Sequence, residues 1–121
     1  MAIESTSELK NDILYVTSKG VDESFEDVRN YATSLILTAQ RANCKKLLID
    51  ERNLEYRLNT MDTFKLAEFA VDNIPRIAQV AIVPNPDCIE DAQFYENVVS
   101  TRGLRLRMFR DLESAEKWVS P

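Results

Sequence analysis

The sequence predicts a small α/β fold with a mixed sheet of four to five strands and flanking helices, in the order β-β-α-β-α-β-α-β-α. Short apolar runs typical of strands alternate with longer segments whose apolar residues recur at helical spacing. This alternation favours right-handed crossovers and a mainly parallel sheet. Of the 121 residues, 45% are hydrophobic and 29% are charged. We therefore expect one domain, residues 1–121, with a single core.

The first two strands are expected to form a hairpin at one edge of the sheet. Residues 3–9 are polar but extended in character, residues 10–12 (Lys-Asn-Asp) are a turn signal, and residues 13–18 are rich in β-branched residues. The first strand has few residues to bury, which is typical of an edge strand. The hairpin would add one antiparallel strand to the sheet.

The middle of the chain predicts a helix, a strand and a loop in turn. Ser24 or Asp22 can cap a helix that runs to about Arg41, with apolar residues along one face. Residues 45–50 contain a short apolar run bounded by charges, which suits a strand covered on both faces. We expect residues 51–59 to form a loop.

The second half continues the alternation. Thr60 is predicted to cap a second helix that ends before Pro75, and residues 78–83 should form a central strand. Pro86 is suited to the start of a third helix that reaches about residue 102, and Gly103 to its C-terminal cap. Residues 104–109 predict a strand with one wet face or an edge strand, and Asp111 is expected to cap a last short helix.

Composition limits the chemistry that the chain is expected to perform. The sequence has no histidine, which removes the commonest group for proton transfer near neutral pH and the histidine-containing zinc sites. Its two glycines cannot form a glycine-rich phosphate loop. We expect no cofactor, no metal and no group equipped to exchange protons at neutral pH.

Charge and hydropathy also narrow the expected partners and compartment. The net charge of −5 argues against a nucleic-acid binder. No apolar run is long enough to span a membrane, and residues 1–10 do not resemble a signal peptide. We expect a cytoplasmic protein in which Cys44 and Cys88 are free thiols.

The order of the elements, with a loop after the second core strand, resembles the STAS domain family, most closely its SpoIIAA-like branch. In anti-sigma-factor antagonists of this family, a strand ending in Asp is followed by a Val-Glu-Phe-like segment and by Asp-Ser-Ser-Gly at the next helix. Asp50 and residues 54–56 (Leu-Glu-Tyr) match the first part, whereas Leu58, Asn59, Thr60 and Met61 stand at the Asp-Ser-Ser-Gly positions. Residues 109–115 are similar to the closing strand and helix. The resemblance implies the scaffold, with a phospho-switch motif that is degenerate here.

The positions equivalent to the phospho-switch are Thr60, Asn59 and Asp50. A phosphate on Thr60 would meet free backbone amides at a helix N-terminus, and its charge could repel or recruit a partner. The simpler interpretation makes Thr60 a plain helix cap and pairs Asp50 with a nearby arginine such as Arg52.

Three further groups of residues have functional interpretations. The second and third helices carry four apolar residues beyond their core faces: Leu66, Phe69, Phe94 and Val98. These residues predict a surface for a second subunit or a partner, and the alternative is that both helices are deeply packed. A group of arginines suggests a site for an anion or an acidic partner, although a solvated strand face is the simpler interpretation: Arg102, Arg105, Arg107 and Arg110. Three acids suggest paired carboxylates for acid–base chemistry, although a solvated loop is the simpler interpretation: Glu51, Glu55 and Asp62.

Two functional hypotheses follow. The first is a non-enzymatic regulatory or protein-interaction module, with a homodimer or another protein as its partner. The second is a small-molecule or lipid-binding domain of the related Sec14-like type, in which a small apolar ligand occupies a cavity lined by Phe64, Phe69, Phe94 and Tyr95. An enzyme is a third possibility, but no arrangement of the Lys, Asp, Cys and Thr residues stands out.

Overall fold

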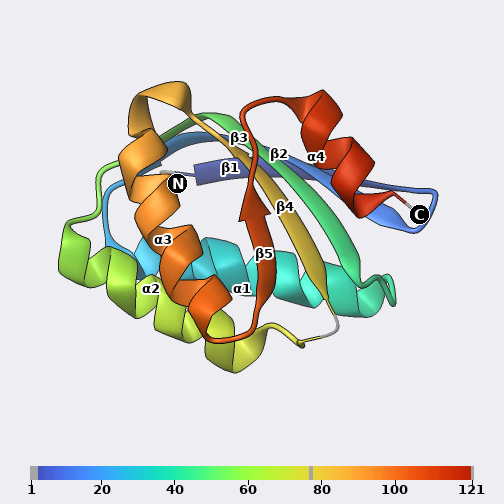
Figure 1. The fold of residues 1–121 in the computed structure, drawn as a ribbon, viewed down its shortest axis with the longest axis horizontal. Coiled ribbons are helices and arrows are strands. Elements are labelled where there is room, and N and C mark those ends of the chain that lie inside the picture. Colours follow the sequence, from blue (N-terminus) through green and yellow to red (C-terminus); the bar gives the residue numbers. More distant parts are fainter. Residues whose placement is uncertain (1–2, 77, 121) are drawn as a thin grey trace.

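A computed structural model describes residues 3–76 and 78–120, and these form a five-stranded mixed sheet with four α-helices (Figure 1). The elements are β1 (Ile3–Lys10), β2 (Ile13–Asp22), α1 (Phe25–Arg41), β3 (Lys46–Tyr56), α2 (Thr60–Asn73), β4 (Gln79–Pro84), the 3₁₀ turn η1 (Pro86–Cys88), α3 (Ile89–Thr101), β5 (Arg105–Met108) and α4 (Leu112–Val119). The predicted fold class and element order are confirmed.

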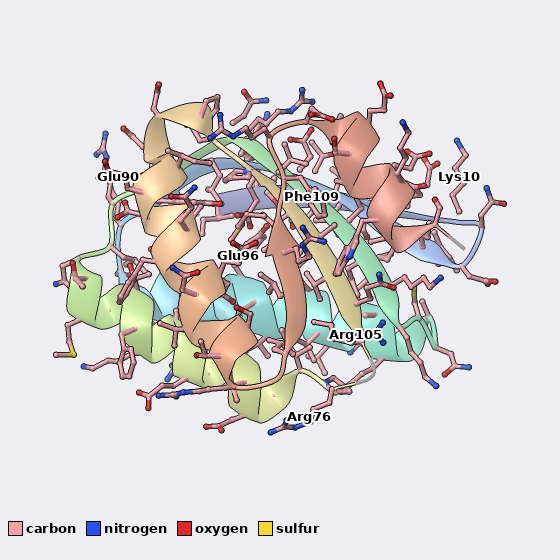
Figure 2. All side chains as sticks on the ribbon, in the orientation of Figure 1. Lys10, Arg76, Glu90, Glu96, Arg105 and Phe109 are labelled. Atoms are coloured by element: carbon pink, nitrogen blue, oxygen red, sulfur yellow. The ribbon has the colours of Figure 1, made fainter. Side chains whose placement is uncertain are left out.

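The strands lie in the order β1-β2-β3-β4-β5. β1 pairs with β2 antiparallel, and the other neighbouring strands pair parallel. β1 and β5 are therefore the edges, as predicted for β1 and as one of the two interpretations of residues 104–109. The edge strand β5 is also tied to α3, because the backbone N–H of Met108 donates to the carboxylate of Glu96 at 2.6 Å. Figure 2 labels Glu96 on this helix.

The helices form two layers with unequal numbers of helices. α1, α2 and α3 cover one face of the sheet, and α4 covers the other (Figure 1). Alternation along β3 serves both layers, since Leu47 and Ile49 join the core under the three helices while Leu48 packs with Ala115 and Val119 of α4. The face under three helices is where the chain encloses space.

β3 is longer than the sequence analysis predicted. The expected loop over residues 51–59 is wrong for residues 51–56, which continue the strand. The reason is tertiary: β2 also extends to Asp22, and beyond an irregularity after Thr17 it supplies backbone partners up to the Asp22–Tyr56 pair. Asp50 consequently lies within the strand rather than at its end.

Side chains cap the helices close to the predicted positions. Ser24 caps α1 and Asp111 caps α4, accepting backbone N–H groups at 3.1 and 2.7 Å. Gly103 follows α3 with a φ of 89°, and the N–H groups of Gly103 and Leu104 donate to carbonyls in the last turn, so the glycine terminator is confirmed. The cap of α2 is Asn59 rather than Thr60, because the Asn59 side chain accepts the N–H of Asp62 at 2.8 Å.

Candidate functional site

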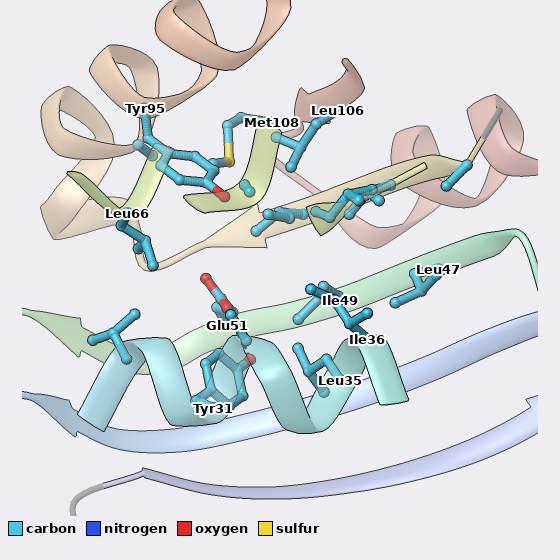
Figure 3. Close-up of a pocket in the computed structure, with 18 of the residues that line it drawn as sticks. Tyr31, Leu35, Ile36, Leu47, Ile49, Glu51, Leu66, Tyr95, Leu106 and Met108 are labelled. Atoms are coloured by element: carbon cyan, nitrogen blue, oxygen red, sulfur yellow. Dashed lines mark hydrogen bonds between the residues drawn. The ribbon is translucent and has the colours of Figure 1, made fainter. Parts of the chain in front are cut away.

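A cavity of about 160 Å³ lies between the sheet and the helices α1, α2 and α3 (Figure 3). Its walls are mainly aliphatic and include Leu35 of α1, Ile49 of β3, Leu66 of α2 and Leu106 of β5. An engineered apolar cavity of about 150 Å³ in another protein binds benzene. The space here is therefore large enough for a molecule built around one small ring.

The carboxylate of Glu51 projects into this cavity. Glu51 follows Leu47 and Ile49 at two-residue spacing on β3, so it shares their inward face and is only 8% exposed. The Tyr31 hydroxyl donates to its Oε2 at 2.8 Å, and the Tyr56 hydroxyl donates to its Oε1. Tyr31 in turn shares a hydrogen bond with the hydroxyl of Ser18. A hydrogen-bond network therefore fixes an acidic group at the wall of an apolar space.

Burial raises the pKa of Glu51, and the hydrogen bonds from Tyr56 and Tyr31 oppose that rise. Burial raises the pKa values of both tyrosines, and the charge of Glu51 contributes in the same direction. The two phenols thus remain donors across the ordinary pH range. The predicted place of Glu51 in a solvated loop is wrong, because the residue is buried within β3.

Asp22 is a second buried acid at the same end of the cavity. It ends β2, is 5% exposed, and its Oδ1 accepts the backbone N–H of Arg57 at 2.5 Å. Burial raises its pKa to about 7, and the negative charges of Glu51 and Asp91 contribute in the same direction. The expectation that no group exchanges protons near neutral pH is therefore wrong.

Tyr95 of α3 faces Glu51 from the opposite wall. Figure 3 shows its hydroxyl directed into the space between α3 and α1. Among the hydrogen bonds of the described residues, none involves this hydroxyl, although burial raises its pKa. Asp91, one helical turn earlier, also lines the cavity and is exposed at its rim. The polar end of the cavity thus keeps hydrogen-bonding capacity that the protein does not use.

The predicted phospho-switch residues do not form one cluster with the cavity. Asp50 lies on the opposite face of β3 from Glu51 and forms a two-pronged ion pair with Arg52, at 2.9 and 2.8 Å, as its simpler interpretation predicted. The Arg52 guanidinium lowers the pKa of Asp50. Asn59 and Thr60 are exposed at the start of α2, and Asn59 provides the cap that Thr60 was expected to provide.

The predicted partner surface is divided by the fold. Leu66 points inward, where it lines the cavity and packs against the cluster of Ile3, Val28 and Leu54, so its expected outward projection is wrong. Val98 is partly buried against the main core, and Phe69 is partly buried. Phe94 remains 37% exposed. Whether these residues meet a partner stays a prediction.

The cavity lining differs from the predicted one. Tyr95 lines the space as expected, whereas Phe64, Phe69 and Phe94 are not among its lining residues. Phe64 instead lies beneath the guanidinium of Arg102, 5.3 Å from its ring centre. Helical spacing alone gives faces of a helix, and it does not reveal which face looks into a void between several elements.

The other charged candidates lie at the surface in separate pairs. Arg102 approaches Glu68 at 3.6 Å, and Arg107 lies over the rings of Phe109 and Trp118. Arg105 on β5 and Arg110 beyond it are exposed, so the four arginines do not gather into one site. Glu55 is exposed and pairs with Arg57 at 2.8 Å, while Asp62 lies in the first turn of α2.

The cysteines, possible metal ligands and possible membrane spans can be described briefly. Cys44 and Cys88 are free thiols, as predicted. Within residues 3–76 and 78–120, no group of three or more potential ligands is arranged to hold a metal ion. No helix in that part of the chain has the length and apolar character needed to cross a membrane.

Two solved structures resemble this chain over almost its whole length. An anti-sigma factor antagonist from Mycobacterium paratuberculosis superposes with a TM-score of 0.67 at 13% identity, covering 97% of this chain and 93% of its own. A DUF3478 protein with a SpoIIAA-like fold, from Shewanella loihica PV-4, superposes with a TM-score of 0.61 at 21% identity, covering 98% of this chain and 94% of its own.

The chain has a SpoIIAA-like fold. This confirms the scaffold that the resemblance implied. No family model matches the sequence, and no curated protein matches it. At these identities the likeness concerns the fold, so the function has to be argued from the residues of this SpoIIAA-like domain.

Neither Asp22 nor Glu51 was predicted as part of a cavity, although a signal for Glu51 is present. Leu47, Ile49 and Glu51 alternate with Leu48 and Asp50, so a strand extended by one residue places Glu51 inward. Asp22 has no comparable signal, because its burial depends on the distant segment around Arg57.

Proposed function

We propose that this chain is a non-enzymatic regulatory module that acts by binding another protein. The observation that carries the proposal is its likeness in fold, over 97% of the chain, to an anti-sigma factor antagonist. The start of α2 supports it further, because Asn59, Thr60 and the 62% exposed Met61 are free to meet a partner. The motif positions differ from those of the antagonists, so binding is proposed without a phospho-switch.

The partner surface is proposed to include the exposed side chains of α2 and α3. Phe94 and Met61 are the large apolar residues that these helices expose among the described residues. A homodimer through the same helices is part of this proposal. Buried aromatic and methionine side chains are enriched at the centres of protein interfaces.

Cross-linking in the native host, followed by capture, tests this function. We expect a specific partner, or a second copy, that is cross-linked to the wild-type chain and lost in Met61→Ser and Phe94→Ser. Leu9→Ser is the matched control, because Leu9 is a 50% exposed apolar residue on β1, outside the two helices. The proposal fails if the three variants capture the same proteins as the wild type and sediment identically.

The cavity favours a second function, binding of a small molecule. Its volume of about 160 Å³ and its largely aliphatic lining are suited to a compact apolar ligand rather than to a long lipid chain. Native mass spectrometry of freshly purified protein tests this directly. A co-purifying small molecule would support the second function, and protein whose mass and stability never respond to any small apolar compound would count against it.

A further inference from the structure

We propose that the cavity under α1, α2 and α3 binds a small apolar molecule with a positively charged amine head, and that the head contacts Glu51 and Tyr95. This inference rests on the second function above and names its ligand class. Three features carry it: the size and lining of the cavity, the charge at its polar end, and unused hydrogen-bonding positions there.

The lining has an apolar middle and gathers its acidic and phenolic groups at one end, while Gln40, Cys44 and Lys45 line the other end. Aliphatic side chains from the sheet and from α1 and α2 enclose most of the space, including Leu35, Ile49, Val80 and Leu66. The described polar groups from β2, β3 and α3 gather near the carboxyl ends of the parallel strands, which is where ligands bind in open α/β sheets. A ligand in this cavity therefore has an apolar body and a polar head.

The polar end is acidic. Asp22 of β2, Glu51 of β3 and Asp91 of α3 contribute carboxyl groups to it. Lys45 is the one cationic side chain among the described lining residues, and it immediately precedes β3, at the opposite end of that strand from Tyr56. An anionic head would be repelled by the carboxyl groups that are ionised, whereas a cationic head would be attracted to them and would favour their ionised form.

Glu51 has capacity for a third hydrogen bond. A carboxylate offers about four acceptor positions, and the hydroxyls of Tyr31 and Tyr56 use one on each oxygen. Both tyrosines are donors to the carboxylate, so they stabilise its charged form without neutralising it. A buried carboxylate that has no cationic partner is costly, and an ammonium group would supply the missing charge.

Tyr95 supplies the second contact. Its hydroxyl is directed into the cavity and has no partner among the described residues, so its oxygen is free to accept a hydrogen bond (Figure 3). Glu51 on β3 and Tyr95 on α3 lie on opposite walls. An ammonium group has several donors and no acceptor, which fits two acceptors facing each other across a small space.

Three probes of nearly equal shape separate the sources of affinity: benzylamine in its protonated form, benzyl alcohol and benzoate. Isothermal titration of the full chain should show benzylammonium binding at least about ten-fold more tightly than benzyl alcohol, with benzoate weakest. Equal affinity for the three would overturn the amine head while leaving a small-molecule site. Failure of all three to bind would overturn both the inference and the second function.

Two variants test whether the amine head of the ligand contacts Glu51 and Tyr95. Glu51→Gln should weaken benzylammonium by about ten-fold and remove the preference over benzyl alcohol, while Glu55→Gln, an exposed acid on the same strand, should change neither. Tyr95→Phe should weaken benzylammonium while keeping the wall in place, and it serves if Glu51→Gln does not fold. Unchanged affinity in Tyr95→Phe and in a folded Glu51→Gln would overturn the inference.

Discussion

Glu51 and Asp22 show how burial gives ordinary acids an unusual setting in this chain. Both side chains line the cavity from adjacent strands, Asp22 at the end of β2 and Glu51 within β3. Both are held by donors, two tyrosine hydroxyls for Glu51 and a backbone N–H for Asp22. Burial raises the pKa of each, which couples the stability of the fold to pH. The coupling can be measured at Asp22, whose pKa of about 7 lies well above its ordinary value of 3.8.

We expect the free energy of unfolding to fall as pH rises from about 4 to about 7, and then to level off. The sign follows from proton binding: in this range the folded chain keeps the proton on Asp22 while the unfolded chain has lost it. The loss due to Asp22 is up to roughly 4 kcal/mol. Asp22→Asn should reduce this pH dependence, measured by urea unfolding at several pH values. Glu23→Gln, the exposed neighbour, should leave it unchanged, and a pH profile that is the same in Asp22→Asn would contradict the assignment.

The hydroxyl of Tyr31 should also contribute to stability. It donates to Glu51 and shares a hydrogen bond with Ser18, so Tyr31→Phe leaves two buried polar groups with fewer partners. The expected cost is about 1–3 kcal/mol in the free energy of unfolding. Tyr15→Phe is the control, because no hydrogen bond of its hydroxyl is described, and it should cost less than half as much in the same unfolding experiment. Equal losses of unfolding free energy in the two variants would contradict a contribution from the hydrogen bonds of the Tyr31 hydroxyl.

At the scale of elements, the start of α2 separates helix capping from any signalling role of Thr60. Asn59 makes the capping hydrogen bond to the N–H of Asp62, whereas Thr60 is the first helical residue and is exposed. Thr60 is therefore available for contacts or modification without being required to begin the helix.

Asn59→Ala should lower the free energy of unfolding by about 1 kcal/mol, because it removes the acceptor for one free N–H group of the first turn. Thr60→Ala should change it by less than about 0.5 kcal/mol. Thermal or urea unfolding of the two variants checks this directly. If Thr60→Ala is the more costly change, the capping assignment is reversed.

At the scale of the whole molecule, the unequal helix layers explain why the cavity lies where it does. Three helices cover one face of the sheet, and their small residues Ala32, Ala70 and Ala92 line the cavity between them. The opposite face is covered by α4 alone, which packs Ala115 and Val119 directly on the sheet. Space for a ligand is thus a property of the three-helix layer.

A larger side chain in the cavity should raise the free energy of unfolding and weaken ligand binding. Ala32→Leu places a larger side chain from α1 at the cavity wall, and we expect it to raise the free energy of unfolding by about 0.5–2 kcal/mol and to weaken benzylammonium. Thr33→Leu, at the exposed neighbouring position, should leave ligand affinity unchanged. Loss of stability with ligand affinity retained would mean that Ala32 does not border usable space.

The sequence by itself determined the fold class, the order of the elements and most of their limits. Apolar periodicity, turn residues and caps such as Ser24, Asp111 and Gly103 act within a few residues of one another, so they can be recognised locally. The same local patterns predicted that Asp50 pairs with Arg52, which lies two residues away on the same strand face.

Only the tertiary structure decided that Glu51 is buried, that Leu66 points inward and that a cavity exists. β3 extends past Asp50 because β2 offers it backbone partners, and Asp22 is covered because the chain returns to it at Arg57. A cavity is the space that α1, α2, α3 and the sheet fail to fill together. Contacts between residues distant in sequence set that space, and no local pattern of apolar and polar residues encodes it.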